Sequence, residues 1–152
     1  MIKLGVTGHR PNRIKGWEQN IREFIRSQIK IAKEGDEEVV LISGMATGVD
    51  QIAAEEAVAA GIELWCYFPY YHTLVEKEKK LVDKASFVRF ESDEYIGKKW
   101  CYLRRDQRIV DDCDRLLVVW DGIKVGGTYD TWKYAYEEGR SMRIFRLDHQ
   151  VM

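Results

Sequence analysis

The sequence has no excess of charge of either sign, few cysteines and histidines, and no long apolar run. Its 24 basic and 25 acidic residues give a formal net charge of −1, which argues against a general affinity for nucleic acid or anionic membranes. No apolar stretch approaches the length of a membrane-spanning helix, and the amino terminus enters a predicted strand without a signal-peptide pattern. We therefore expect a cytoplasmic protein with no membrane partner.

Cysteine and histidine are too sparse for a disulfide framework or a zinc site. The three cysteines are odd in number and lack Cys-x-x-Cys spacing, which is typical of reduced cysteines that pack in a core. The three histidines lie far apart in the chain, and no His-Glu-x-x-His motif is present. We expect no metal and no required cofactor.

Apolar patterning alternates between strand and helix along the whole chain. The run 39–42 is continuous and rich in valine and isoleucine, as in a strand covered on both faces, and 115–120 repeats this pattern. Strands are predicted at 2–8, 39–42, 62–68, 86–90, 115–120 and 142–147, and helices at 17–34, 51–60, 74–84, 96–112 and 128–138. This alternation predicts an α/β fold, a three-layer sandwich with a mostly parallel, Rossmann-like sheet. The length favours one domain, 1–152.

Three glycine-containing loops follow predicted strands. They are Thr7-Gly8-His9-Arg10, Ser43-Gly44-Met45-Ala46-Thr47-Gly48-Val49-Asp50 and Gly126-Gly127-Thr128. A strand that turns through glycines into a helix presents backbone N–H groups at the helix start, which suits a phosphate. The carboxyl ends of parallel strands lie at one edge of the sheet, where ligands of such folds bind. The loops therefore predict a nucleotide-sized ligand.

Several side chains near these loops have two interpretations each. Asp50 is either a ribose contact or part of a capping box with Thr47. Asp121 is either a ribose contact or the first residue of an Asp-Gly turn. Thr128 is either a ligand contact or a helix cap, and Thr131 lies one turn further along the same helix.

Arg10 is either a partner for the phosphate, through its planar guanidinium, or a surface residue. Arg105 would otherwise be a solvated helix residue, and it enters the predicted site only through the family resemblance given next. Aromatic residues such as Tyr70, Tyr71 and Trp120 are interpreted as packing residues rather than as base-stacking platforms. The predicted ligand site comprises Gly8, His9, Arg10, Ser43, Gly44, Gly48, Asp50, Arg105, Asp121, Gly126, Gly127, Thr128 and Thr131.

Four segments, in order along the chain, resemble motifs of the SLOG superfamily. They are Gly5 to Pro11, Ile42 to Asp50, Arg105 to Asp111, and Trp120 to Gly122 together with the Gly126-Gly127-Thr128 loop. This Rossmann-like group includes the LOG phosphoribohydrolases and the DprA DNA-processing proteins, and the chain is most similar to its small stand-alone members in bacteria and phages. Because the group includes hydrolases, nucleotide sensors and DNA binders, the resemblance implies a fold and a ligand class rather than one activity.

The favoured implication is binding of a nucleotide-derived small molecule, such as an ADP-ribose-like signal, that the protein senses or sequesters. The first alternative is a LOG-like nucleotide phosphoribohydrolase. Arg105 matches that family, but Tyr134 stands where its catalytic glutamate is expected, so catalysis ranks below binding. The second alternative is DprA-like binding of single-stranded DNA, against which the near-neutral charge argues. The resemblance to LOG-like dimers also suggests a homo-oligomer.

Overall fold

The computed structural model describes residues 1–95 and 97–147 and consists of alternating strands and helices. The strands are β1 (Ile2–Gly8), β2 (Val39–Ser43), β3 (Glu63–Phe68), β4 (Phe87–Phe90), β5 (Arg115–Trp120) and β6 (Ser141–Arg146). The helices are α1 (Glu18–Lys33), α2 (Val49–Ala59), α3 (Glu76–Val82), α4 (Lys98–Asp112) and α5 (Gly127–Glu137), with a short 3₁₀ turn at Pro11–Arg13. Every predicted element is present, although residue 96 of one predicted helix and the end of the predicted domain, 148–152, lie outside the described residues.

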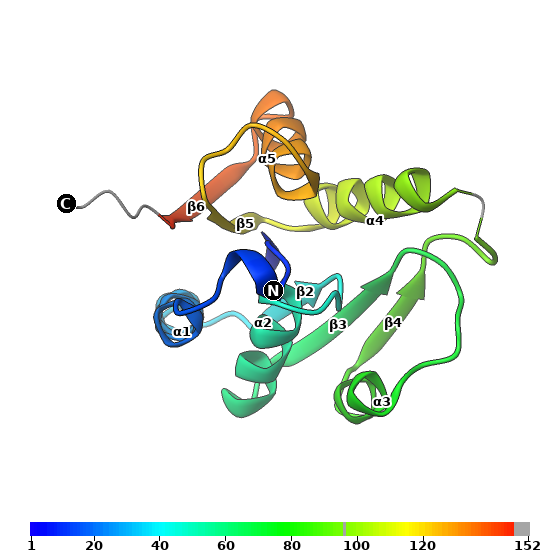
Figure 1. Ribbon diagram of the computed structural model, residues 1–152. Helices are drawn as coiled ribbons and strands as arrows, with labels where there is room; N and C mark the ends of the chain where they lie inside the picture. The colour runs from blue at the N-terminus through cyan, green and yellow to red at the C-terminus, as the bar shows by residue number, and fades with distance from the viewer. Residues whose placement is uncertain (96, 148–152) are drawn as a thin grey trace.

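The strands form one six-stranded sheet in the order β4-β3-β2-β1-β5-β6, and each neighbouring pair of these strands is parallel. Helices α1, α2 and α3 cover one face, and α4 and α5 cover the other (Figure 1). The predicted α/β three-layer sandwich with a Rossmann-like sheet is therefore confirmed. None of the described helices combines the length and apolar character needed to cross a bilayer.

The buried strand β2 contributes side chains to two hydrophobic cores, one on each face of the sheet. Its side chains alternate between the faces, as the pleat of a strand requires. Val39 and Leu41 pack with the α1 and α2 residues, whereas Val40 and Ile42 pack with residues of α4 and α5. The continuous apolar run in the sequence follows directly from this two-sided burial.

The strand order reverses at β1, which lies between β2 and β5. From β1 the chain winds outward to β2, β3 and β4, and then crosses the sheet to β5 and β6 (Figure 1). The loops that follow β1 and β5 therefore diverge and leave a crevice at the carboxyl edge of the sheet. The fold places the first and last glycine loops on either side of this crevice.

Glycines allow the loop after β1 to pack directly on the start of α2. A Cβ added at Gly8 would lie 2.5 Å from the Cβ of Val49, and one added at Gly48 would clash with the carbonyl oxygen of His9. Gly48 also has a φ of +100°, which residues with side chains rarely adopt. The Val49 N–H donates to the His9 carbonyl at 3.1 Å and closes this junction.

Candidate functional site

A cleft of about 460 Å³ opens at the carboxyl edge of the sheet, at the reversal of strand order. Its walls come from the loops after β1 and β2, from one side of α4 and from the first turn of α5. The lining residues are Thr7, Gly8, His9, Arg10, Asn12, Arg13, Ala46, Asp50, Lys99, Tyr102, Arg105, Asp106, Gly127 and Thr128. A volume of this size accommodates a small-molecule ligand.

The cleft is cationic although the whole chain is nearly neutral. Four basic side chains line it against the two carboxyl groups of Asp50 and Asp106. Basic groups that converge in a concave, low-dielectric surface raise the local concentration of anions. The site therefore favours a negatively charged ligand.

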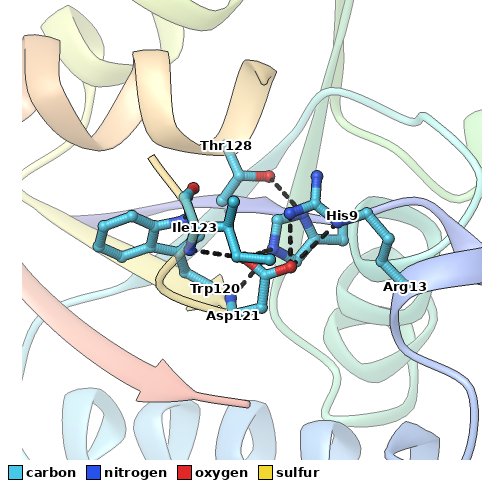
Figure 2. A network of polar contacts seen from close by, with 6 residues as sticks. All are labelled: His9, Arg13, Trp120, Asp121, Ile123 and Thr128. Carbon is cyan, nitrogen blue, oxygen red and sulfur yellow. Dashed lines mark hydrogen bonds and ion pairs between the residues drawn. The ribbon is translucent and has the colours of Figure 1, made fainter. Parts of the chain in front are cut away.

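His9 connects the two sides of the crevice (Figure 2). The Asp121 N–H donates to Nε2 of His9 at 3.1 Å, and Nδ1 of His9 lies 3.2 Å from Oγ1 of Thr128. Burial, with a contribution from Arg13, lowers the pKa of His9, so the ring is neutral at neutral pH. Because Nε2 accepts a hydrogen bond, the neutral ring carries its proton on Nδ1. The Nδ1–H then donates a hydrogen bond to Oγ1 of Thr128. The hydroxyl hydrogen of Thr128 is then available to a ligand in the cleft.

Asp121 lies behind the cleft and orients Arg13 (Figure 2). One carboxylate oxygen accepts the Ile123 N–H at 3.0 Å, and the other accepts from Nε of Arg13 at 3.0 Å and from Nη2 of the same side chain. Burial alone would raise the pKa of Asp121, but the bonds from Ile123 and Arg13 outweigh it and lower the pKa. The Asp121 carboxylate thus stabilises the Asp-Gly turn and orients Arg13, which lines the cleft.

Arg105 is a buried cation shared by the site and the fold. It is 3 % exposed, and its Nη1 donates to the carbonyl oxygens of Gly44 and Tyr67 while Nε donates to Asp106 at 2.7 Å. Burial would lower the pKa of Arg105, but the charges of Asp106 and then Asp50 outweigh it and raise the pKa. A Cβ at Gly44 would lie 2.8 Å from the guanidinium carbon, so the glycine makes room for this side chain.

Asp50 lies in the cleft and does not cap its helix. The N-cap of α2 is Gly48, which has no side chain, and Thr47 is exposed, so the capping box considered from the sequence is not formed. Burial raises the pKa of Asp50 to about 7, although Arg105 acts in the opposite direction. Ser43 is fully buried behind the cleft, where its hydroxyl donates to the Asp50 carbonyl at 2.7 Å and accepts the Met45 N–H.

The loop before α5 brings Gly127 and Thr128 to the cleft. Gly126 is the N-cap of α5, with a φ of +102°, so Thr128 is not the helix cap that one interpretation predicted. Thr131 is buried and donates to the Gly127 carbonyl at 2.8 Å, which places its hydroxyl in the helix rather than in the lining of the cleft. The loop therefore contributes a backbone and one hydroxyl to the site.

Comparison with known proteins supports the fold. No protein-family model and no curated protein matches the chain. The fold resembles that of DprA. DprA from Streptococcus pneumoniae has a TM-score of 0.72 at 22 % identity over 95 % of this chain and 50 % of that chain. DprA from Helicobacter pylori, described for its single-stranded DNA binding mode, has a TM-score of 0.71 at 20 % identity over 96 % of this chain and 66 % of that chain.

A structural-genomics target, TM1055, has a TM-score of 0.63 at 16 % identity over 93 % of this chain and 72 % of that chain. At these identities the matches show a shared Rossmann-like fold. The chain spans half the length of the pneumococcal DprA and about two thirds of the Helicobacter pylori DprA. The shared fold therefore does not determine the activity of this chain.

The site predicted from the sequence overlaps the cleft in part. Gly8, His9, Arg10, Asp50, Arg105, Gly127 and Thr128 line it, whereas Ser43, Gly44, Gly48, Asp121, Gly126 and Thr131 lie behind or beside it. The sequence analysis missed Thr7 at the end of β1, Asn12 and Arg13 in the 3₁₀ turn, and Ala46 after β2. It also missed Lys99, Tyr102 and Asp106, which line the cleft from α4. Their spacing of three and four residues places them on one helix face, so Asp106, next to the predicted Arg105, was a signal for the other two.

Proposed function

We propose that the protein binds a phosphorylated, nucleotide-derived small molecule in the cleft. The observation that carries this proposal is the convergence of four basic side chains in a near-neutral chain: Arg10, Arg13, Lys99 and Arg105. They face the open backbone of Gly127 and the hydroxyl of Thr128 at the start of α5. Cationic side chains and a helix N-terminus together favour a phosphate over a neutral ligand.

The roles of the lining residues follow from their exposure. Arg10 is exposed, and its guanidinium lies 5.9 Å from the centroid of the Tyr102 ring, where it can pair with a phosphate. Arg105 is committed to two carbonyls and Asp106 and acts mainly by its charge. Asp50 and Asp106 are acceptors for ribose hydroxyls. We propose that the protein senses or sequesters its ligand in the cytoplasm, and that an ADP-ribose-like molecule is a suitable candidate.

A thermal-shift screen of mononucleotides, dinucleotides and ADP-ribose derivatives tests the proposal. A ligand at one hundred times its Kd stabilises the native state by about 2.7 kcal/mol. Arg10→Gln should weaken the hit by about tenfold or more, because a charge-assisted bond is lost. Lys15→Gln, on an exposed residue outside the lining of the cleft, is the matched control. Absence of any shift across the panel, with folded and ligand-free protein, would contradict the proposal.

A second candidate function is hydrolysis of a nucleotide N-glycosidic bond. It is favoured by Asp50, a carboxyl group in the cleft whose pKa burial raises to about 7, a value suited to acid–base chemistry at neutral pH. Tyr134, by contrast, donates to Asp111 at 2.8 Å and lies outside the lining of the cleft. Chromatography of AMP incubated with the protein detects free base. If the protein is a hydrolase, it should release free base from AMP. Asp50→Asn should abolish this release without loss of AMP binding.

A third candidate, binding of single-stranded DNA, is favoured by the fold shared with DprA and by the basic cleft. Its signature is an affinity that falls steeply with salt. The logarithm of the association constant should fall with the logarithm of the salt concentration with a slope of about −0.7 for each phosphate contacted. A titration of a fluorescent decanucleotide at 50 and 200 mM salt distinguishes it from small-molecule binding. A flat salt response or no binding would exclude it.

A further inference from the structure

A second cavity of about 440 Å³ adjoins the cleft, between the N-terminal half of α4, the loop residues 124–126 and the first turn of α5. We call it the side chamber. It shares Lys99, Tyr102, Asp106 and Gly127 with the cleft, so the same four residues form the border between the two spaces. Since both cavities exceed 400 Å³, each has room for a nucleoside-sized group.

Gly127 holds this border open. It is the first residue of α5, and a Cβ added there would meet nothing within 4 Å among the described residues. The preceding Gly126 has a φ of +102°, which explains a glycine there by backbone conformation alone. Gly127 does not have a positive φ, so its backbone conformation does not require a glycine. We infer that a glycine is present there because the missing side chain keeps the space between the two cavities free.

The two cavities differ in chemistry. The cleft has four basic side chains against two carboxyl groups, whereas the walls that belong to the side chamber alone include Leu103, Val125 and Tyr129, with one cation, Lys124, and one carboxylate, Asp130. The Tyr129 ring is fixed by stacking on Trp120, with centroids 5.9 Å apart and planes at 25°. Apolar and aromatic walls beside a cation suit a ring system that is attached to a phosphate.

We propose that the ligand has two nucleoside-sized halves joined through phosphate, with one half in the cleft, the other in the side chamber and the linker passing Gly127. This inference rests on the proposed function. A 5′–5′ diphosphate and a 3′–5′ phosphodiester both supply such a linker. Joining two halves makes the second contact intramolecular, so a linked ligand binds more tightly than either half alone.

The test is calorimetry with three probes: AMP, 5′–5′-linked diadenosine diphosphate and 3′–5′-linked adenylyl-adenosine. We expect at least one linked probe to bind ten times more tightly than AMP. Gly127→Leu, which obstructs the border, should reduce this advantage to less than threefold. Val125→Trp should do the same without touching the cleft, because Val125 is 64 % exposed and lines only the side chamber of the two. Gly35→Leu, at a glycine with open surroundings and no positive φ, is the matched control.

The outcomes separate this inference from the proposed function. If AMP binds and neither linked probe binds more tightly, or if the advantage survives both variants, the two-chamber inference is wrong and the proposed function stands. If none of the probes and no other nucleotide binds, the proposed function fails and the inference fails with it. A series of oligonucleotides completes the test. Affinity that continues to rise tenfold with each nucleotide added beyond two would indicate a strand-binding groove and overturn the inference.

Discussion

Arg105 shows how a single residue belongs to both the site and the fold. Because its guanidinium bonds the carbonyls of Gly44 and Tyr67 and the carboxylate of Asp106, Arg105→Ala leaves buried acceptors unpaired. We expect a loss of about 3 kcal/mol or more in the free energy of unfolding, measured by urea denaturation. Arg104→Ala, on a side chain that is 48 % exposed, should change it by about 0.5 kcal/mol or less. Equal stabilities of the two variants would show that Arg105 has no structural role.

Asp50 makes the stability of the protein depend on pH. Burial raises its pKa from 3.8 to about 7, with Asp106 acting in the same direction and with Arg105 and Arg10 opposing it. Between these two values the folded chain retains a proton that the unfolded chain releases, so the contribution of Asp50 to stability falls as pH rises and levels off above about pH 7.

Asp50→Asn should therefore remove this loss, because an amide does not ionise. The variant should gain stability relative to the wild type between pH 4 and pH 8, by at most about 1.4 kcal/mol per pH unit. Urea denaturation at several pH values measures the difference, and Asp83→Asn at the exposed end of α3 is the control. A constant difference across this range would contradict the assignment.

At the residue scale, the sequence predicted the cleft where a residue type and its local motif agreed. Gly8 ends β1, Arg10 follows it and Gly127 begins α5, and all three line the cleft, while their contact with a ligand stays a prediction. Tyr102 and Lys99 were missed because tyrosine and lysine on a helix are usually packing or surface residues, and only the tertiary position of α4 brings them to the site.

The junction between the loop after β1 and the start of α2 is an element-scale device. Gly8→Ala would place a methyl group 2.5 Å from the Cβ of Val49 and force the loop away from the helix. We expect a cost of about 1–3 kcal/mol, as for overpacking of a core. Val49→Ala removes both methyl groups, each 2.6 Å from the added carbon, and keeps only the Cβ contact. The double variant should therefore lose less than the sum of the two single variants.

A double-mutant cycle by chemical denaturation measures this coupling. Gly5 is a different case, because its Cβ would meet Ile109 of α4 and Cys113, the residue after α4. Val49→Ala should therefore not reduce the cost of Gly5→Ala. Additive costs for the Gly8 and Val49 changes would show that the close approach does not determine the junction.

At this scale the sequence predicted which elements exist but not which loops touch. Periodicity and apolar runs are local properties, so they gave the helices and strands close to their observed bounds. The interpretation of Gly44 and Gly48 as ligand contacts considered only their own loop. In the folded chain Gly44 faces Arg105 and Gly48 faces His9, contacts that no local pattern contains.

At the scale of the whole molecule, the net charge does not predict the local electrostatic field in the cleft. A formal net charge of −1 correctly describes the average surface but says nothing about a cleft where four cations meet two carboxyls. The strand alternation, by contrast, is a global pattern, and it was sufficient to predict the parallel sheet and its two helical layers. The cationic site arises because the crossover from β4 to β5 brings Lys99 and Arg105 of α4 beside Arg10 and Arg13, which follow β1.

The three cysteines test whether the chain unfolds as one unit, as expected of a single domain. Cys66 packs on the α2 side of the sheet and Cys113 on the α4 side, while Cys101 lies in the first turn of α4, and all three thiols are free and buried. Burial raises the pKa of Cys66 to about 12 and that of Cys113 to about 11, which further suppresses their reaction as thiolates.

We expect none of the three to react with a thiol reagent in the native state, and all to become labelled with the same opening free energy, equal to that of global unfolding. Labelling during a urea series, with each cysteine quantified by peptide mass spectrometry, measures this energy site by site. The unfolded chain in high urea is the control for reagent access. Earlier labelling of Cys101 than of Cys66 and Cys113 would show that the start of α4, and with it Lys99 and Tyr102 of the cleft, opens independently of the sheet.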